Sequence, residues 1–176
     1  MRPPVNIERL RSTLKILGDE ARSPGCIFLV GGATALLYGW RNSTMDIDLC
    51  MSPEPQGVFE AIRRVKDRQQ VSIELASPPD FIPEVSGWRD RCVWICRHGN
   101  VDFFHYDLVS QALAKLERAH IRDLADVTEM VAAGLVSRKQ ILEGFETIRP
   151  GLLRYPGVDE DAFERRVQAF VSGEKP

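Results

Sequence analysis

Two aspartates in the segment VGGATALLYGWRNSTMDIDLCM, residues 30–51, are the side chains most able to do chemistry. Asp46 and Asp48 lie two residues apart in an apolar run, and residues two apart in a strand point to the same face. Adjacent ionised carboxylates repel each other, and an apolar setting adds to the cost. Mg²⁺ or Mn²⁺, which prefer oxygen ligands, relieve this repulsion. The pair predicts a metal site, against the alternative of a solvated strand end.

A glycine pair precedes the aspartates in the same segment. Gly31 and Gly32 follow the apolar run CIFLV and open a short helical pattern, to which Thr34 adds a hydroxyl. Glycine lets a phosphate approach the backbone, and the N–H groups at a helix start attract anions. A glycine pair by itself is commonly just a tight turn. Combined with the carboxylate pair, it predicts phosphoryl or nucleotidyl transfer.

The elements that must position these residues follow from hydrophobic periodicity, caps and turn residues. We expect an α+β fold in which helices flank a mixed sheet and a C-terminal helical annex follows. The α/β core would span 1–106 and the helical region 107–176. The expected strands are 26–31, 44–51 and 71–76, with a hairpin over 91–107 that turns at His98, Gly99 and Asn100. The expected helices are 7–21, 32–40, 57–70, 108–119, 122–134, 138–148 and 160–173.

Composition excludes several classes of protein. The net charge of −2 argues against broad nucleic-acid coating but not against a local basic patch. The four cysteines form no CxxC pair and histidine is scarce, which argues against zinc and favours reduced thiols. The N-terminal residues lack a leader's apolar stretch, and no run reaches the length of a membrane span. We therefore expect a cytoplasmic protein without a membrane partner.

The order of these motifs resembles a known superfamily. VGG, thirteen residues and then DIDL is similar to the signature of DNA polymerase β-type nucleotidyltransferases. GGATALLYGWRNSTMDIDL together with YDLVSQALAKLERAHIRDLADV resembles, more closely, the AbiEii-like branch, which includes toxins of type IV toxin–antitoxin systems. The resemblance covers about residues 26–134. It implies a nucleotidyltransferase fold, an NTP substrate and Mg²⁺ or Mn²⁺ as cofactor.

The resemblance also implies roles for individual residues. Lys115 matches a helix lysine near the triphosphate, and Asp123 and Asp126 match a late acidic motif. Arg122 stands where the family often has lysine; it keeps the charge but cannot exchange a proton. The expected phosphate-binding residues are Gly31, Gly32, Thr34, Arg41, Ser43, Thr44 and Arg118. The expected catalytic residues are Asp46, Asp48, Asp102, Lys115, Asp123 and Asp126.

Two of these assignments have plain structural alternatives. Asp102, in NVDFF, is the expected third metal ligand or general base, or else an edge-strand aspartate paired with a neighbouring arginine. The cluster around Lys115 either faces the active site or forms a salt-bridged surface. Asp107, which precedes the run LVSQALAKL, is instead expected to cap that helix.

The predicted function is transfer of a nucleotidyl group from an NTP to an RNA acceptor, such as a tRNA, or to a protein. A toxin in a toxin–antitoxin pair, with a cognate antitoxin as partner, is the expected biological form. One alternative is a catalytically silent module of the same fold that binds a nucleotide or a protein. Another is a nucleotidyltransferase that modifies an antibiotic.

Overall fold

The computed structural model describes residues 3–173, and its contacts divide the chain into two compact units. The first unit comprises the chain up to Ser77 together with Cys92–Tyr106, and the second comprises Pro78–Arg91 and the chain from Asp107 onward. The segment Pro78–Arg91 lies within the range expected for the α/β core but associates with the helices. One contact that holds it there is the Tyr155 hydroxyl, which donates to the Pro79 carbonyl at 3.0 Å.

A mixed five-stranded sheet forms the centre of the first unit, in the order β3-β2-β1-β5-β4. β1 pairs with β5 and β2 with β3 in parallel, whereas β1–β2 and β4–β5 are antiparallel. This sheet and its flanking helices confirm the predicted α+β class. The strands are β1 Gly25–Val30, β2 Asp46–Met51, β3 Ser72–Leu75, β4 Val93–His98 and β5 Val101–His105. The helices are α1 Ile7–Glu20, α2 Gly32–Tyr38 and α3 Val58–Gln69.

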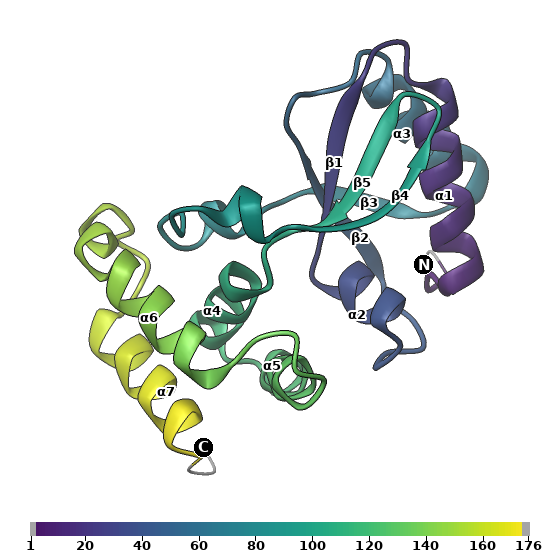
Figure 1. Ribbon diagram of the computed structural model, residues 1–176. Helices are drawn as coiled ribbons and strands as arrows, with labels where there is room; N and C mark the ends of the chain where they lie inside the picture. The colour runs from purple at the N-terminus through teal and green to yellow at the C-terminus, as the bar shows by residue number, and fades with distance from the viewer. Residues whose placement is uncertain (1–2, 174–176) are drawn as a thin grey trace. The chain divides into compact units, whose positions relative to one another are not determined.

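The hydrophobic core of this unit lies on one face of the sheet. Figure 1 shows α1 and α3 together on that face, with α2 near the end of β1. Ile27, Leu29 and Phe103 point into this core and have no exposed surface. Because side chains alternate along a strand, the residues between them belong to the opposite face, which also carries Asp46 and Asp48.

The second unit is helical. Its α-helices are α4 Leu108–Arg118, α5 Ile121–Ala132, α6 Arg138–Ile148 and α7 Glu160–Ser172, and its 3₁₀ helices are η1 Pro78–Asp80, η2 Trp88–Arg91 and η3 Arg149–Arg154. Phe145 and Phe163 meet edge to face at 4.9 Å between α6 and α7. Within residues 3–173, no helix combines the length and the apolar character that a membrane span requires.

Local sequence accounts for where the helices begin. Asn6 accepts from the Arg9 amide, Asp159 accepts from the Ala162 amide, and Ser137 forms a capping box with Gln140. The predicted cap at Asp107 is confirmed as well, because its carboxylate accepts from the amides of Val109 and Ser110. These caps satisfy N–H groups that otherwise lack partners in the first turn of a helix.

Candidate active site

Three carboxylates meet on the first unit's sheet, on the face opposite its core. Asp46 and Asp48 project from β2, while Ile47 and Leu49 between and beyond them are fully buried in the core, as the alternation predicts. Glu74 on β3 lies beside Asp48 in the strand register. One oxygen from each of the three carboxylates lies within 4.8 Å of the others. Three oxygen donors this close form a set that suits Mg²⁺ or Mn²⁺.

Glu74 is the member of this group that sequence analysis missed. It stands in the strand that follows the aspartate strand after a single helix, α3. A strand–helix–strand connection makes its two strands parallel, and most often neighbours. An acidic residue midway along SIEL was therefore a usable signal for a carboxylate next to Asp48.

The glycine pair packs directly against the aspartate strand and the segment that leads into it. Gly31 has φ of +61°, a left-handed conformation, and a Cβ there would lie 3.1 Å from Asp48 Oδ2. A Cβ on Gly32 would lie only 2.1 Å from Thr44 Oγ1 and 3.6 Å from an Arg41 guanidinium nitrogen. Glycine at both positions is thus a condition for bringing this turn against Asp48, Thr44 and Arg41.

The other residues expected to bind phosphate differ in accessibility. Thr44 is buried and pairs through its backbone with Val5, which ties the N-terminal segment to the start of β2. Ser43, next to it, is exposed. Thr34 has no exposed surface, and its hydroxyl donates to the Leu29 carbonyl at 3.2 Å. A hydroxyl enclosed in this way supports the turn from inside, which differs from the expected direct contact with a phosphate.

His105 supports the same turn from β5. Its Nδ1 lies 3.2 Å from Thr34 Oγ1, and because that hydroxyl donates to Leu29, we assign the imidazole proton to Nδ1. Tyr38 stacks on the imidazole at 4.4 Å, and Trp40 stacks on Tyr38 at 5.4 Å. Burial lowers the pKa of His105 from 6.5 to about 4, and burial also raises the pKa of Tyr38. The imidazole is therefore neutral in the folded protein at neutral pH.

The buried imidazole makes a pH-dependent contribution to stability. Because the pKa of His105 is about 4 when folded and 6.5 when unfolded, the unfolded chain binds the extra proton as the pH falls between these values. This site is expected to lower the free energy of unfolding by about 2 kcal/mol between pH 7.5 and pH 5. Urea unfolding of wild type and His105→Phe at both pH values measures the difference. Equal pH dependence in the two proteins would contradict the assignment.

The structure does not bring Asp102 to the carboxylate group. Along β1, Val30 is the register partner of Asp48, and Cys26 is the register partner of Asp102. These positions are four residues apart, which corresponds to about 13 Å along the strand. Asp102 instead forms an ion pair with Arg97, the alternative that the sequence had left open. Its place as third carboxylate is taken by Glu74.

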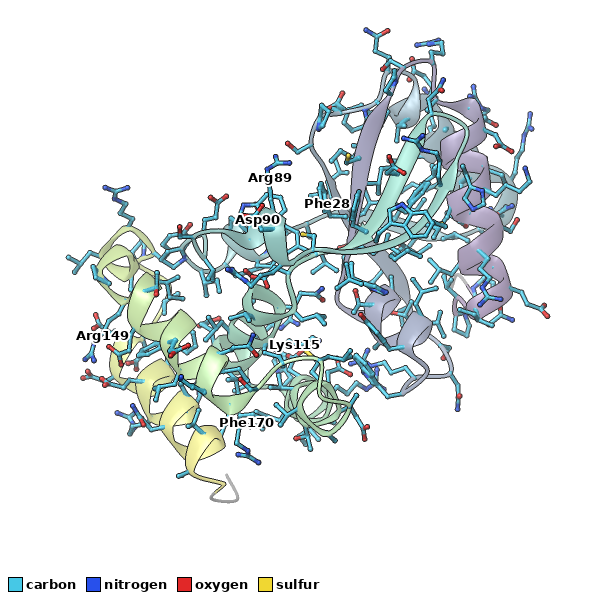
Figure 2. The ribbon with its side chains drawn as sticks, in the orientation of Figure 1. Phe28, Arg89, Asp90, Lys115, Arg149 and Phe170 are labelled. Atoms are coloured by element: carbon cyan, nitrogen blue, oxygen red, sulfur yellow. The ribbon has the colours of Figure 1, made fainter. Side chains whose placement is uncertain are left out.

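A second charged cluster lies inside the helical unit, where Figure 2 shows Lys115 among the helices. Lys115 Nζ donates to Asp126 at 2.5 Å and to Asp123 at 3.3 Å. Arg118 donates to both oxygens of Asp123, at 2.7 and 2.9 Å. The side chains of Lys115, Asp123 and Asp126 are nearly inaccessible, whereas that of Arg118 is 46% exposed. The predicted contact between Lys115 and a triphosphate stays a prediction.

The surroundings of Asp123 favour its ionised form. Burial by itself would raise the pKa of Asp123, but the hydrogen bonds from Arg118 and the charges of Lys115 and Arg118 outweigh it and lower the pKa. At the other end of α4, Arg91 donates to both oxygens of the buried Asp107, at 2.9 and 2.8 Å. The helix with the lysine is thus held by ion pairs at its start and near its end.

The mixed sheet, the glycine turn and the adjacent acidic strand together fit a nucleotidyltransferase fold. Comparison with protein families agrees: the model for a family described as nucleotidyltransferase of unknown function, DUF6036, matches residues 6–144. The match spans most of the chain, including both charged clusters, and the protein belongs to this family. Neither the curated proteins nor the solved structures contained a match.

Proposed function

We propose that the protein transfers a nucleoside monophosphate from an NTP to a hydroxyl of an RNA or protein acceptor. The observation that carries the proposal is the meeting of Asp46, Asp48 and Glu74 beside the Gly31–Gly32 turn. Family membership supports the reaction class. We assign metal binding to the three carboxylates, and phosphate binding to the glycine turn with Arg41, Ser43 and Thr44.

The residues present fit a divalent cation. Three carboxylate oxygens supply negative charge and hard ligands, and no sulfur or imidazole is needed. When bound, Mg²⁺ or Mn²⁺ would supply charge neutralisation and orientation for phosphates. Gly31 lies so near Asp48 that an added Cβ would be 3.1 Å from its Oδ2, which places the glycine turn beside one of the proposed metal ligands.

The proposed reaction is a substitution at the α-phosphorus. An acceptor hydroxyl oxygen forms a bond to this phosphorus, and its proton passes to solvent. The bond from the α-phosphorus to the oxygen that bridges to the β-phosphate breaks, and pyrophosphate leaves with the electron pair. Arg41, whose guanidinium lies close to Gly32, is the cation suited to the negative charge of the phosphates.

The biological role we propose is that of a toxin, which a cognate antitoxin would neutralise. This proposal rests on the likeness of the two sequence motifs to AbiEii-like proteins. Expression in a bacterial host tests it, since wild type would arrest growth and the Asp46→Ala/Asp48→Ala variant would not. Equal growth with both proteins would remove the toxin role and leave the chemistry to be tested separately.

The chemistry is tested by incubating the protein with each α-³²P-labelled NTP, Mg²⁺ or Mn²⁺, and either total RNA or a cell extract. We expect label in a macromolecule with wild type and none with Asp46→Ala/Asp48→Ala, because the variant lacks two of three carboxylates. Asp67→Ala, a change at an exposed aspartate on α3, is the matched control and should retain transfer. Nuclease or protease digestion identifies the labelled acceptor.

The outcomes separate the possible functions. Label released by nuclease supports an RNA acceptor, and label released by protease supports a protein acceptor. Metal-dependent NTP binding without transfer to either would favour a nucleotide-binding module. Absence of both transfer and metal-dependent NTP binding would overturn the proposal.

A further inference from the structure

Asp102 holds an indole and a guanidinium together on the first unit. Its Oδ1 accepts from Trp94 Nε1 at 3.2 Å and from Arg97 Nε at 3.0 Å, and its Oδ2 accepts from Arg97 Nη2 at 2.6 Å. The hydrogen bonds from Arg97 lower the pKa of Asp102, so the carboxylate stays ionised and keeps both donors. We call these three residues the Trp94 platform.

An irregularity in β4 is what makes the platform. Trp94 is the register partner of Phe104, whereas Cys96 is the partner of Phe103 and Arg97 the partner of Asp102. The register shift between Trp94 and Cys96 therefore inserts one extra residue. In a regular strand, residues three apart point to opposite faces; the bulge puts Trp94 and Arg97 on the same face.

That face is the one that carries the proposed metal ligands. The register connects Cys50, Phe28, Phe104 and Trp94 in one row across four strands, and Asp48 lies two residues from Cys50 on β2. Phe28 stacks on Phe104 at 5.4 Å, and Figure 2 shows Phe28 on the side of the sheet away from α1. Asp48 and Trp94 are therefore separated by roughly 16 Å. This estimate takes about 4.8 Å between neighbouring strands and about 3.3 Å between successive residues along a strand.

Stability does not explain this arrangement. Trp94 is 57% exposed and the Arg97 side chain is 62% exposed, so most of the indole surface gains nothing from burial. An ion pair this exposed contributes little to folding. Arg97 Nη1 has no partner within residues 3–173. The structure thus holds an accessible aromatic ring and a cation in fixed positions.

We propose that the Trp94 platform binds single-stranded RNA, the acceptor of the proposed transfer, several nucleotides away from the reacting end. An unpaired base stacks on an exposed indole without regard to sequence, and a guanidinium pairs with the adjoining phosphate. The platform and the carboxylates share this face, at the separation that the register gives. Asp102 is a positioning residue, since it fixes the two contacting groups. The inference rests on the proposed function, because it takes RNA to be the acceptor of the proposed transfer.

The test measures binding of a fluorescently labelled, mixed-sequence RNA of 12 nucleotides to the full chain by anisotropy, without NTP. We expect Trp94→Ala to weaken binding between about fivefold and about a hundredfold, because a base loses its stacking partner. Trp94→Phe should restore most of the affinity, and Arg97→Ala should weaken binding and lessen its salt dependence. Phe59→Ala and Arg11→Ala, at exposed positions of α3 and α1, are the matched controls and should bind like wild type.

Metal-dependent NTP binding is measured on the same proteins, so that failure of this inference is distinct from failure of the proposed function. Trp94→Ala with unchanged NTP binding and weakened RNA binding supports the platform. RNA binding that is equal in wild type and Trp94→Ala overturns it. Tighter binding of the same RNA as a duplex, or label transfer to protein without any RNA affinity, also overturns it. Loss of metal-dependent NTP binding in wild type itself would instead remove the proposed function.

Discussion

Replacing Glu74 by glutamine is expected to lower nucleotidyl transfer by more than about a hundredfold, because even groups that only support metal ligands contribute about 10–100-fold. Glu74 lies beside Asp48 in the register. One of its carboxylate oxygens lies within 4.8 Å of an oxygen of Asp46 and of Asp48. Glutamine keeps the shape but removes the charge that holds the cation. The measurement is the rate of label transfer, together with the Mn²⁺ concentration required for NTP binding.

Asp102→Asn provides the comparison. Asp102 pairs with Arg97, and its register position lies four residues away from that of Asp48. Metal-dependent NTP binding by Asp102→Asn should therefore equal that of wild type, with the Mn²⁺ requirement unchanged. If Asp102→Asn loses this binding and Glu74→Gln retains it, the third carboxylate has been assigned to the wrong strand.

Replacing Lys115 by methionine is expected to lower the free energy of unfolding by about 3–5 kcal/mol, because it breaks a buried ion pair by removing one of its two members. The Lys115 ammonium lies 2.5 Å from Asp126, and both residues are almost completely buried. Asp123 loses only one of its two cationic partners in this variant, because Arg118 still donates to both of its oxygens. Chemical denaturation followed by the helical circular dichroism signal measures the loss.

The double variant identifies the cause of that loss. Lys115→Met/Asp126→Leu should recover most of the stability, because both members of the buried ion pair are then replaced by apolar side chains. A deficit that the second substitution does not reduce would point to lost packing instead.

The same pair of variants tests the predicted triphosphate contact. If Lys115 only balances buried charge, the stable double variant should bind NTP as well as wild type does. If Lys115 also contacts the triphosphate, the double variant should be stable but bind NTP poorly. Its near-complete burial favours the first outcome.

Much of the first charged group was predictable because its geometry is local. Asp46 and Asp48 had to share a face once their segment formed a strand, and an apolar alternation predicts the strand. The caps at Asn6, Asp107, Ser137 and Asp159 were likewise readable, since each depends on contacts within one helical turn. Sequence alone thus determined the strands, the α-helices, their order and the central carboxylate pair.

The tertiary structure decided which distant residues join that pair. The placement of β3 next to β2 brings in Glu74, whereas β5 holds Asp102 at the register position of Cys26, at the start of β1. A bulge in β4, which no periodicity predicts, places Trp94 and Arg97 on one face, where both donate hydrogen bonds to Asp102. Periodicity reports only which way a residue points within its own element. Strand order and register depend on packing between segments far apart in the chain, and these select the partners of each carboxylate.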